Sequence, residues 1–240
     1  MSEKNKKTDS QFSEIQLKLN KVWNHTDLST TCCRQCGCCR VACPQMKYSE
    51  AVNILTIIWS DWSREDKKNF LKTCIRYFFS RSLVKPCPML VGNECRVYGD
   101  RPLNCRLYGL WPEDMWNRRV EGLAKKLGLE KVQIPLNQQC VFVKRKNGQP
   151  LTEELIEGLF RSLDELDVVL LAESDATRYE EWQGRIDRNW NYRAIHDWAL
   201  LRFFGEEWLM NMTTIALSAN SEQVEKLIET IEKVVEDTVE

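Results

Sequence analysis

The 240-residue sequence predicts a mainly α-helical protein with a loop-rich cysteine-cluster region and one or two short β-hairpins. Three observations support this fold class. Apolar residues recur three and four positions apart over most of the chain, which is the period of a helix with one buried face. Ser, Thr and Pro stand where such segments begin. Cysteines, glycines and prolines gather in residues 32–44 and 87–105, where no helical period is present.

The first expected helix covers residues 10–24. Phe12, Ile15, Leu19 and Val22 lie on one face of it. Residues 1–9 are polar, and we expect them to be frayed.

Two further helices are expected after the first cysteine group. Ser49 is a candidate N-cap for the first, and Ser63 with Asp66 has the pattern of a cap for the second. Pro86 follows the second helix, which therefore ends before it. Cys74 falls on the apolar stripe of that helix, and we interpret it as a core residue, because free cysteine packs as a small hydrophobe.

The segment after Pro86 predicts short extended pieces and then a helix. Residues 87–90 and 95–98 flank Val91-Gly92-Asn93, which has the composition of a hairpin turn. Pro112, with acidic residues directly after it, predicts the start of a helix that runs to about Leu127. Two short strands are expected at residues 131–135 and 140–144.

The remainder of the chain has helical patterning throughout. Asn147-Gly148-Gln149-Pro150 forms a break, and Thr152 is positioned to cap a helix to about Ala172. Residues 175–186 and 188–204 continue in a helical pattern. The last segment is an amphipathic helix with these apolar positions: Val224, Leu227, Ile228, Ile231, Val234 and Val235.

Charge divides the sequence near residue 150. Residues 1–150 hold 26 Lys and Arg against 14 Asp and Glu, a net +12, and residues 151–240 hold 8 against 21, a net −13. We therefore predict a basic cysteine-cluster metal-binding domain over 1–150 and an acidic helical domain over 151–240. The two parts either attract each other, or the chain offers a docking surface to an acidic partner. Nucleic-acid binding is disfavoured, since the basic residues are scattered and accompany no nucleic-acid-binding motif.

Sequence features also predict a cytoplasmic location. No stretch approaches 18 apolar residues, and residues 1–10 carry no apolar signal sequence. In the reducing cytoplasm, cysteines serve as metal ligands or catalytic groups more often than as disulfides. The cysteine count of eleven is odd, so complete pairing within one chain is impossible.

Residues 32–44 carry the strongest chemical signal, with six of the eleven cysteines in thirteen positions. Cys33, Cys36, Cys39 and Cys43 follow the spacing C-x2-C-x2-C-x3-C-P, which is the run that binds [4Fe–4S] clusters in bacterial ferredoxins. Cys38 permits a second register in the same run. The sequence therefore predicts one or two [4Fe–4S] clusters.

A second group must complete the ligand set, because a tight loop places only three thiolates around one cluster. Cys87, Cys95 and Cys105 form that group, with Cys140 as a further candidate. The assignment of cysteines to clusters stays open. Zinc is the alternative metal, since Zn²⁺ also takes four thiolates and Cys33 with Cys36 forms a C-x2-C pair.

Several of these residues also carry a family resemblance. The matching residues are Cys33, Cys36, Gly37, Cys38, Cys39, Arg40, Cys87, Pro88, Leu90, Gly92, Cys95, Tyr98, Arg101, Pro102, Cys105 and Arg106. The pattern resembles the CxxCxxCC cysteine-cluster family of the YkgJ type, whose domain is described as chelating zinc or iron through eight cysteines. It covers residues 30–110 and extends to Cys140 if that is the last family cysteine.

One departure from the family changes the expected metal. Gly37 directly precedes Cys38, where the family usually has one more residue, and Cys43-Pro44 is added. The run then also resembles the iron–sulfur subunits of heterodisulfide-reductase-like complexes, over about twelve residues, and this favours iron. Proteins described as flagellin lysine methylases carry a related cysteine cluster, so a group-transfer enzyme is a second alternative.

Residues beside the cysteines have two interpretations. Arg40, Tyr98, Arg101 and Arg106 either donate to the cluster sulfurs, which raises the reduction potential, or satisfy backbone carbonyls. Tyr108, Trp111 and Trp116 follow closely. We expect them to pack as core residues, a role that is compatible with shielding the site from water.

Conventional catalysis has little support in the sequence. His25 precedes the cysteine run as a weaker ligand candidate, and His196 has the surroundings of a packed helix residue. The sequence contains no nucleophile elbow, P-loop or Rossmann glycine pattern. We expect the chain to work with a protein partner, either a redox enzyme or a subunit of a redox complex.

Overall fold

The computed structural model describes residues 3–25, 43–80, 82, 85–92, 94–108, 110–128, 151–174 and 192–239. The elements in chain order are α1 (Glu3–His25), β1 (Gln45–Lys47), α2 (Tyr48–Asp61), α3 (Arg64–Phe79), β2 (Leu90–Val91), β3 (Glu94–Cys95), α4 (Leu103–Leu107), α5 (Glu113–Leu127), α6 (Glu153–Ser174), β4 (Tyr192–Ala194), α8 (Ile195–Phe204), α9 (Glu206–Ser218) and α10 (Ser221–Thr238). Helices dominate the described residues, and the strands form two small antiparallel sheets. The predicted fold class is confirmed.

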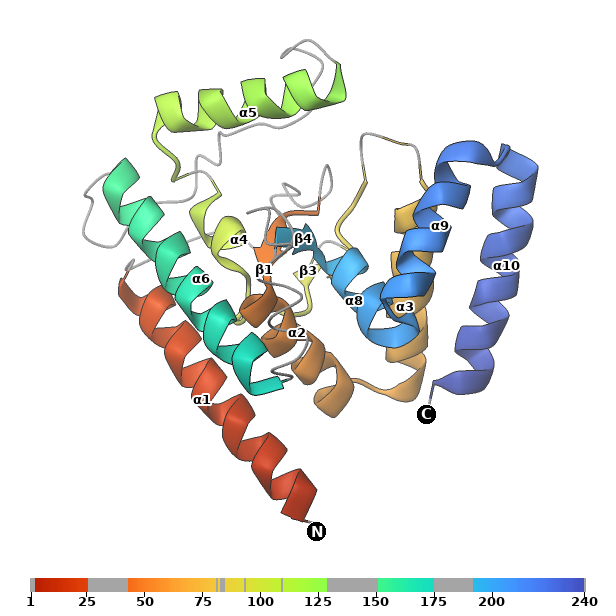
Figure 1. Ribbon diagram of the computed structural model, residues 1–240, viewed down its shortest axis with the longest axis horizontal. Helices are drawn as coiled ribbons and strands as arrows, with labels where there is room; N and C mark the ends of the chain where they lie inside the picture. The colour runs from red at the N-terminus through yellow and green to blue at the C-terminus, as the bar shows by residue number, and fades with distance from the viewer. Residues whose placement is uncertain are drawn as a thin grey trace.

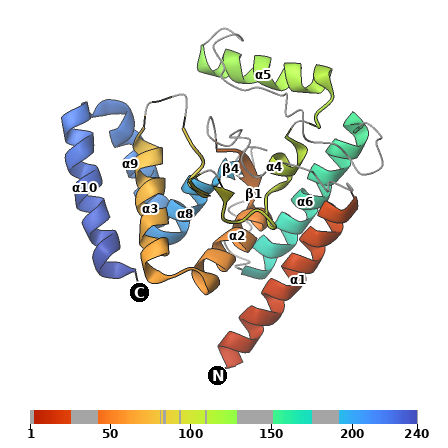
Figure 2. The same ribbon diagram turned by 180° about the vertical axis from the view of Figure 1, so that it is seen from behind.

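The helices form two groups around the short strands. Helices α1 and α6 pack along each other on one side, and α3 lies between α8 and α10 on the other (Figures 1 and 2). Helix α2 contacts both groups, through α1 and α6 and through α8. The strands lie in the middle of the molecule. Among the described residues, no helix is both long and apolar enough to cross a membrane.

Strand β1 pairs with β4, which comes late in the sequence. The antiparallel register aligns Gln45 with Ala194 and Lys47 with Tyr192. Trp198 of α8 adds a side-chain hydrogen bond to β1, because its indole Nε1 donates to the carbonyl of Met46 at 3.4 Å. The expectation of continuous helix over residues 188–204 is wrong where it includes β4. A strand is recognised in a sequence by alternating apolar and polar residues, and three residues are too few to show that alternation. Strand β4 also forms its hydrogen bonds with a segment that is distant in the sequence.

The observed helix N-termini confirm two of the predicted N-caps and contradict a third. Ser63 caps α3, since its side chain accepts from the N–H of Asp66, and Thr152 caps α6 by accepting from Leu155 at 3.2 Å. The predicted cap at Ser49 is wrong, because α2 already begins at Tyr48 and the buried carboxylate of Asp167 accepts from its first N–H groups. Helix α1 begins at Glu3, earlier than expected.

Two hydrophobic clusters form the core. The larger joins α2 and α3 with α8, α9 and α10 through Ile58, Leu71, Ile195 and Val235. The second joins α1, α4 and α6 through residues such as Leu19, Leu103 and Ile156. Both clusters contain residues from either side of position 150. The predicted division into two domains at that position stays a prediction.

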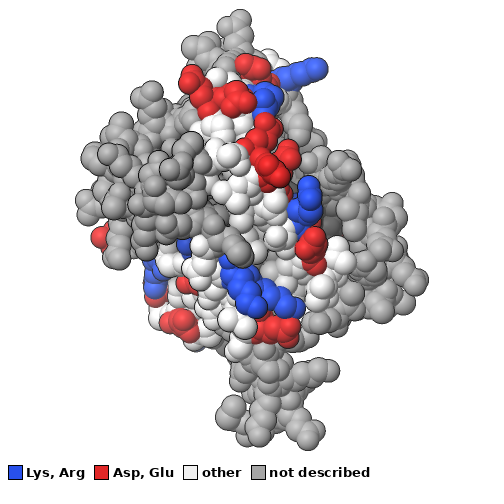
Figure 3. Space-filling view, turned by 90° about the vertical axis from the view of Figure 1, so that its left-hand side faces the viewer, with Lys and Arg blue, Asp and Glu red and all other residues white. Residues whose placement is uncertain are grey.

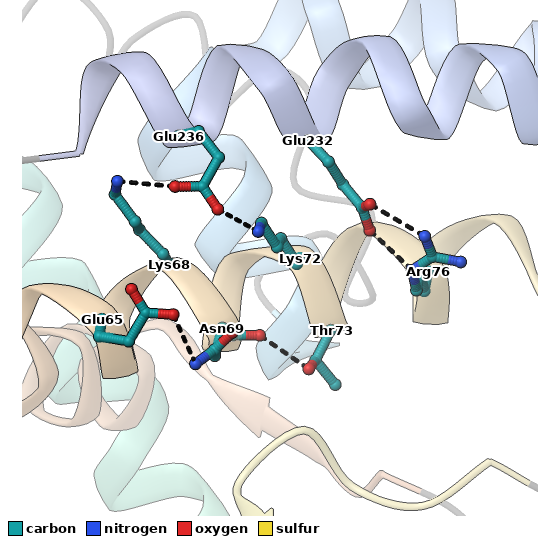
Figure 4. Close-up of polar contacts among 8 residues, drawn as sticks. All are labelled: Glu65, Lys68, Asn69, Lys72, Thr73, Arg76, Glu232 and Glu236. Carbon is teal, nitrogen blue, oxygen red and sulfur yellow. Dashed lines mark hydrogen bonds and ion pairs between the residues drawn. The ribbon is translucent and has the colours of Figure 1, made fainter.

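Opposite charges meet where α3 packs on α10. Glu236 pairs with both Lys68 and Lys72, and Arg76 pairs with Glu232 (Figure 4). Arg76 also pairs with Glu225. The cations come from the basic part of the sequence and the carboxylates from the acidic part. Figure 3 likewise shows both signs of charge interspersed on the described part of another face. These contacts support attraction between the two parts, although each exposed pair contributes only about 0–1 kcal/mol.

Two carboxylates are buried beside the start of α2. Asp167 from α6 accepts from the N–H groups of Tyr48 at 3.1 Å and Ser49 at 2.7 Å. Glu50 is 1% exposed and accepts from two other backbone N–H groups. Burial raises the pKa of Asp167 to about 6 and that of Glu50 to about 7.

The raised pKa of Asp167 predicts a pH-dependent stability. From pH 4 to pH 6 the folded state keeps a proton that the unfolded state has lost, so the free energy of unfolding decreases as pH rises through this window. A pKa near 6 against an ordinary 3.8 corresponds to at most about 3 kcal/mol. The free energy of unfolding, measured by urea unfolding at pH 4 and at pH 7, should therefore decrease less between the two pH values in Asp167→Asn than in the wild type.

The control is Glu165→Gln, which removes an exposed carboxylate from the same helix. A pH dependence of Asp167→Asn equal to that of the wild type would contradict this account, as would an equal change in the control.

Candidate metal centre

Two cysteines from different predicted groups meet in the structure. The Sγ atoms of Cys43 and Cys87 lie 3.7 Å apart, although 44 positions separate the residues in the sequence. Cys43 is the last cysteine of the ferredoxin-like run, and Cys87 is the first of the downstream group. The structure therefore joins the two groups at this pair.

Cys87 and Cys95 are held by a small hairpin. The N–H of Leu90 donates to the carbonyl of Cys87 at 3.0 Å, and Leu90 pairs with Cys95 in the β2–β3 sheet. Gly92 turns the hairpin with φ of +62°, which a residue with a Cβ adopts only with strain. Backbone N–H groups two residues downstream, those of Met89 and Val97, donate to the two sulfurs and favour their thiolates.

Cys43 is held by the sheet on the other side. It precedes β1 by two residues, and Ile195 directly follows β4, so the antiparallel pairing brings them together. The N–H of Ile195, in the first turn of α8, donates to the Cys43 sulfur and favours its thiolate. The positive end of the helix dipole acts in the same direction.

Tyr77 of α3 fixes the backbone of Cys43. Its Oη accepts from the Cys43 N–H at 2.9 Å, and its ring lies 4.2 Å from the ring of His196, centre to centre. The ammonium group of Lys85 lies over the Tyr77 ring, 5.0 Å from its centre. Tyr77 therefore links the cysteine to the helical core.

The two contacting thiols do not ionise alike. The pKa of Cys87 is lowered, because the Cys43 thiol donates to it and the Met89 N–H adds a second hydrogen bond. The same Cys43–Cys87 hydrogen bond, followed by burial, raises the pKa of Cys43. Cys87 is thus the first of the pair to become a thiolate, and a metal ion would replace both protons.

Cys95 and Cys105 lie within electrostatic reach of this pair. A charge on Cys105 raises the pKa of Cys43. Burial raises the pKa of Cys95, and a charge on Cys87 raises it further. Cys74 is fully buried in the larger core cluster, and burial raises its pKa far above the ordinary value. A charge on Cys87 raises the pKa of Cys74 further. Its predicted role as a core residue is confirmed.

The arginines beside the downstream cysteines bond to backbone carbonyls. Arg101 lies over the ring of Tyr98 at 3.6 Å and donates to the Tyr98 carbonyl at 2.9 Å. Arg106 donates to the carbonyls of Arg101 and Gly99, and its guanidinium lies over Trp23. The Arg101 charge also lowers the pKa of Cys95. Tuning of a cluster by these arginines stays a prediction.

Other predicted residues fall into two sets. Trp111 is buried in the second core cluster against Phe160, as expected for a packing residue. His196 is nearly buried, and burial lowers its pKa to about 3, which agrees with a packed and neutral helix residue. The following predicted site residues lie outside the described ranges: Cys33, Cys36, Cys38, Cys39, Arg40 and Cys140.

Sequence patterns did not identify Tyr77 or Ile195 as neighbours of the cysteines. Tyr77 follows Cys74 by three positions on α3, which is a helical spacing but no metal-site motif. Ile195 acts through its backbone N–H, and a backbone group has no signature in the sequence. Only the β1–β4 pairing, which is itself hard to predict, brings it to Cys43.

The described residues fit a thiolate-bound metal in their chemistry. Two cysteine sulfurs lie in contact, and the backbone donors at three sulfurs and the charge of Arg101 favour thiolate ligands. Within the described ranges, no group of three or more His, Cys, Asp or Glu side chains converges closely enough to hold a metal. The rest of a ligand set would have to come from cysteines outside those ranges.

Comparisons with known proteins add no assignment. No family model, curated protein or solved structure matches this chain. The resemblance to the CxxCxxCC family therefore rests on the matching residues alone and stays a prediction.

Metal-free protein should form a Cys43–Cys87 disulfide in preference to pairings with the other cysteines that the structure describes, Cys74, Cys95 and Cys105. Oxidised glutathione, added to chelator-treated protein, accepts the two electrons as the two thiols release their protons and form the bond. The two sulfurs already lie in contact at 3.7 Å, so the bond can form with little movement of the chain. Mass spectrometry of proteolytic peptides identifies the pairing.

Cys74 provides the internal control, because its thiol is fully buried and should remain unmodified. A Cys43–Cys87 yield no higher than that of disulfides involving Cys74 would contradict the described geometry.

Proposed function

We propose that this chain is an iron–sulfur protein that binds one or two [4Fe–4S] clusters and acts in electron transfer or as an accessory subunit of a redox complex. The observation that carries the proposal is the ferredoxin spacing of Cys33, Cys36, Cys39 and Cys43, whose last member contacts Cys87 of the downstream group. Cys43 belongs to a run with ferredoxin spacing, and such a run needs a ligand from elsewhere in the chain. The Cys87 hairpin is suited to supply that ligand.

Surroundings of the described sulfurs support a redox role. Hydrogen bonds from backbone N–H groups to cluster sulfurs stabilise the reduced, more negative state. Ile195, Met89 and Val97 offer such hydrogen bonds to Cys43, Cys87 and Cys95. When bound, the cluster would supply one-electron chemistry, while these residues orient the thiolates and limit water around them.

A zinc-binding structural or interaction protein is the second candidate. Thiolates that share one tetrahedral Zn²⁺ ion lie about 3.8 Å apart, given a Zn–S bond of about 2.3 Å. The Cys43–Cys87 distance of 3.7 Å agrees with this value. On a cubane cluster, each cysteine binds a separate iron and the sulfurs lie farther apart. Metal-free thiols that share a proton also lie about 3.7 Å apart, so this distance does not by itself indicate zinc. We therefore give more weight to the ferredoxin spacing of the four cysteines, which favours iron.

A cytoplasmic location belongs with this function, because reduced thiols remain available for metal there. The protein partner that we propose is a redox enzyme or another subunit of a redox complex. Some of the charges that make the two parts of the sequence unequal pair with each other between α3 and α10, so these charges need no external partner.

Anaerobic purification should yield brown protein with iron and acid-labile sulfide in equal amounts. Reduction should bleach the visible absorption and produce an EPR signal. Cys43→Ser should lower the iron content of at least one cluster, because it removes a thiolate ligand, whereas Cys74→Ser should retain full iron, since Cys74 is a core residue.

Colourless protein with stoichiometric zinc would replace the iron–sulfur proposal with the zinc alternative. Metal of neither kind, in protein prepared without oxygen or chelator, would contradict both.

A further inference from the structure

Glu50 joins two segments that each carry a predicted metal ligand. Its Oε2 accepts from the N–H of Lys47 at 3.1 Å, and its Oε1 accepts from the N–H of Leu103 at 2.5 Å. Lys47 follows Cys43 by four residues, and Leu103 precedes Cys105 by two. One carboxylate therefore connects the β1 segment to the start of α4.

Only the first of these contacts is needed to cap a helix. The bond to Lys47 is the reciprocal half of a capping arrangement at the start of α2, which surface carboxylates provide in many helices. The bond to Leu103 lies outside α2 and satisfies the first N–H of a different helix. Helix α4 follows Pro102, whose own side chain offers no cap.

The carboxylate is buried at a considerable energetic cost. Glu50 is 1% exposed, and burial of a carboxyl group is unfavourable unless hydrogen bonds compensate. The Arg106 charge favours its ionised form, while the nearby Asp167 opposes it. A capping contact on the surface would avoid this cost, so the buried position is explained by what the second bond holds in place.

A second bridge spans the same two segments. Asn104 Nδ2 donates to the carbonyl of Gln45 at 2.5 Å. Gln45 is two residues after Cys43, and Asn104 directly precedes Cys105. The two bridges hold the chain near Cys43 against the chain near Cys105, whose charge already acts on the Cys43 thiol.

We propose that Glu50 is a positioning residue for the metal centre, because its carboxylate fixes the α4 segment with Cys105 against the β1 segment with Cys43. The inference rests on the proposed function for the identity of the centre, but the positioning itself is a property of the folded chain. Cys87 is placed by the β2–β3 hairpin and does not depend on Glu50.

Glu50→Gln tests the inference, because the amide keeps the size of the side chain and loses one of its two acceptors. In metal-free protein, a short dimaleimide should cross-link Cys43 to Cys105 at least fivefold more slowly than in the wild type, as mapped by mass spectrometry. The Cys43–Cys87 disulfide should form at the wild-type rate. In metal-loaded protein, a chelator should release the metal at least fivefold faster.

Two controls separate positioning from general loosening. Glu65→Gln removes an exposed carboxylate of α3 that accepts from Asn69, and it should leave all three rates unchanged. Glu50→Asp keeps a carboxylate at the start of α2 but is one methylene too short to hold both N–H groups. It repeats the test if circular dichroism shows that Glu50→Gln has lost helix.

Wild-type rates of cross-linking and metal release in both Glu50 variants would overturn the inference. An equal slowing of the Cys43–Cys105 and Cys43–Cys87 reactions would also overturn it, since this would indicate a loosened fold. Failure of the proposed function is distinguishable: if Cys43→Ser retains all of its metal, that function is contradicted, while the cross-linking result still decides the role of Glu50.

Discussion

The antiparallel pairing of β1 with β4 is the constraint on which the candidate site depends. Three residues on each side hold together segments that are far apart in the sequence, with Gln45 opposite Ala194. The pairing places Cys43 beside the N–H of Ile195 and carries Met46 into the larger core cluster. So short a sheet is not stable alone. It persists because α2 and α8 continue directly from its strands and contact each other, and because α8 packs on α3, whose Tyr77 holds the Cys43 backbone.

Polar groups, rather than apolar contacts alone, fix the segments around the cysteines. Asp167 holds the first N–H groups of α2, and Glu50 holds both the residue before α2 and the first residue of α4. Each carboxylate is buried and is compensated by backbone donors, so removal of one partner leaves the other unsatisfied. Backbone donors play a similar part at the sulfurs themselves. The result is a loop-rich centre whose geometry is set by hydrogen bonds from the helices around it.

Sequence patterns predicted the long elements and failed at the contacts between them. Helices α3, α5, α6 and α10 follow from apolar period, caps and prolines, because those signals are local. Strand β4 was missed, since β1, the strand that it pairs with, is remote in the sequence. Asp167 was not recognised as the group that serves α2 in place of a cap at Ser49. Cysteine spacing indicated two groups that must meet, and the Cys43–Cys87 contact agrees with this expectation. Tyr77 carried no signal, because a single acceptor on a helix has no pattern.

The central claim is that the early cysteine run and the Cys87 hairpin contribute to one metal centre. X-ray absorption spectroscopy at the edge of the bound metal tests it most directly, by comparing anaerobic wild type with Cys87→Ser. An all-sulfur first shell is expected in the wild type, with sulfur replaced by oxygen at one position in the variant. A first shell of nitrogen and oxygen in the wild type, or an unchanged sulfur shell in Cys87→Ser, would contradict it.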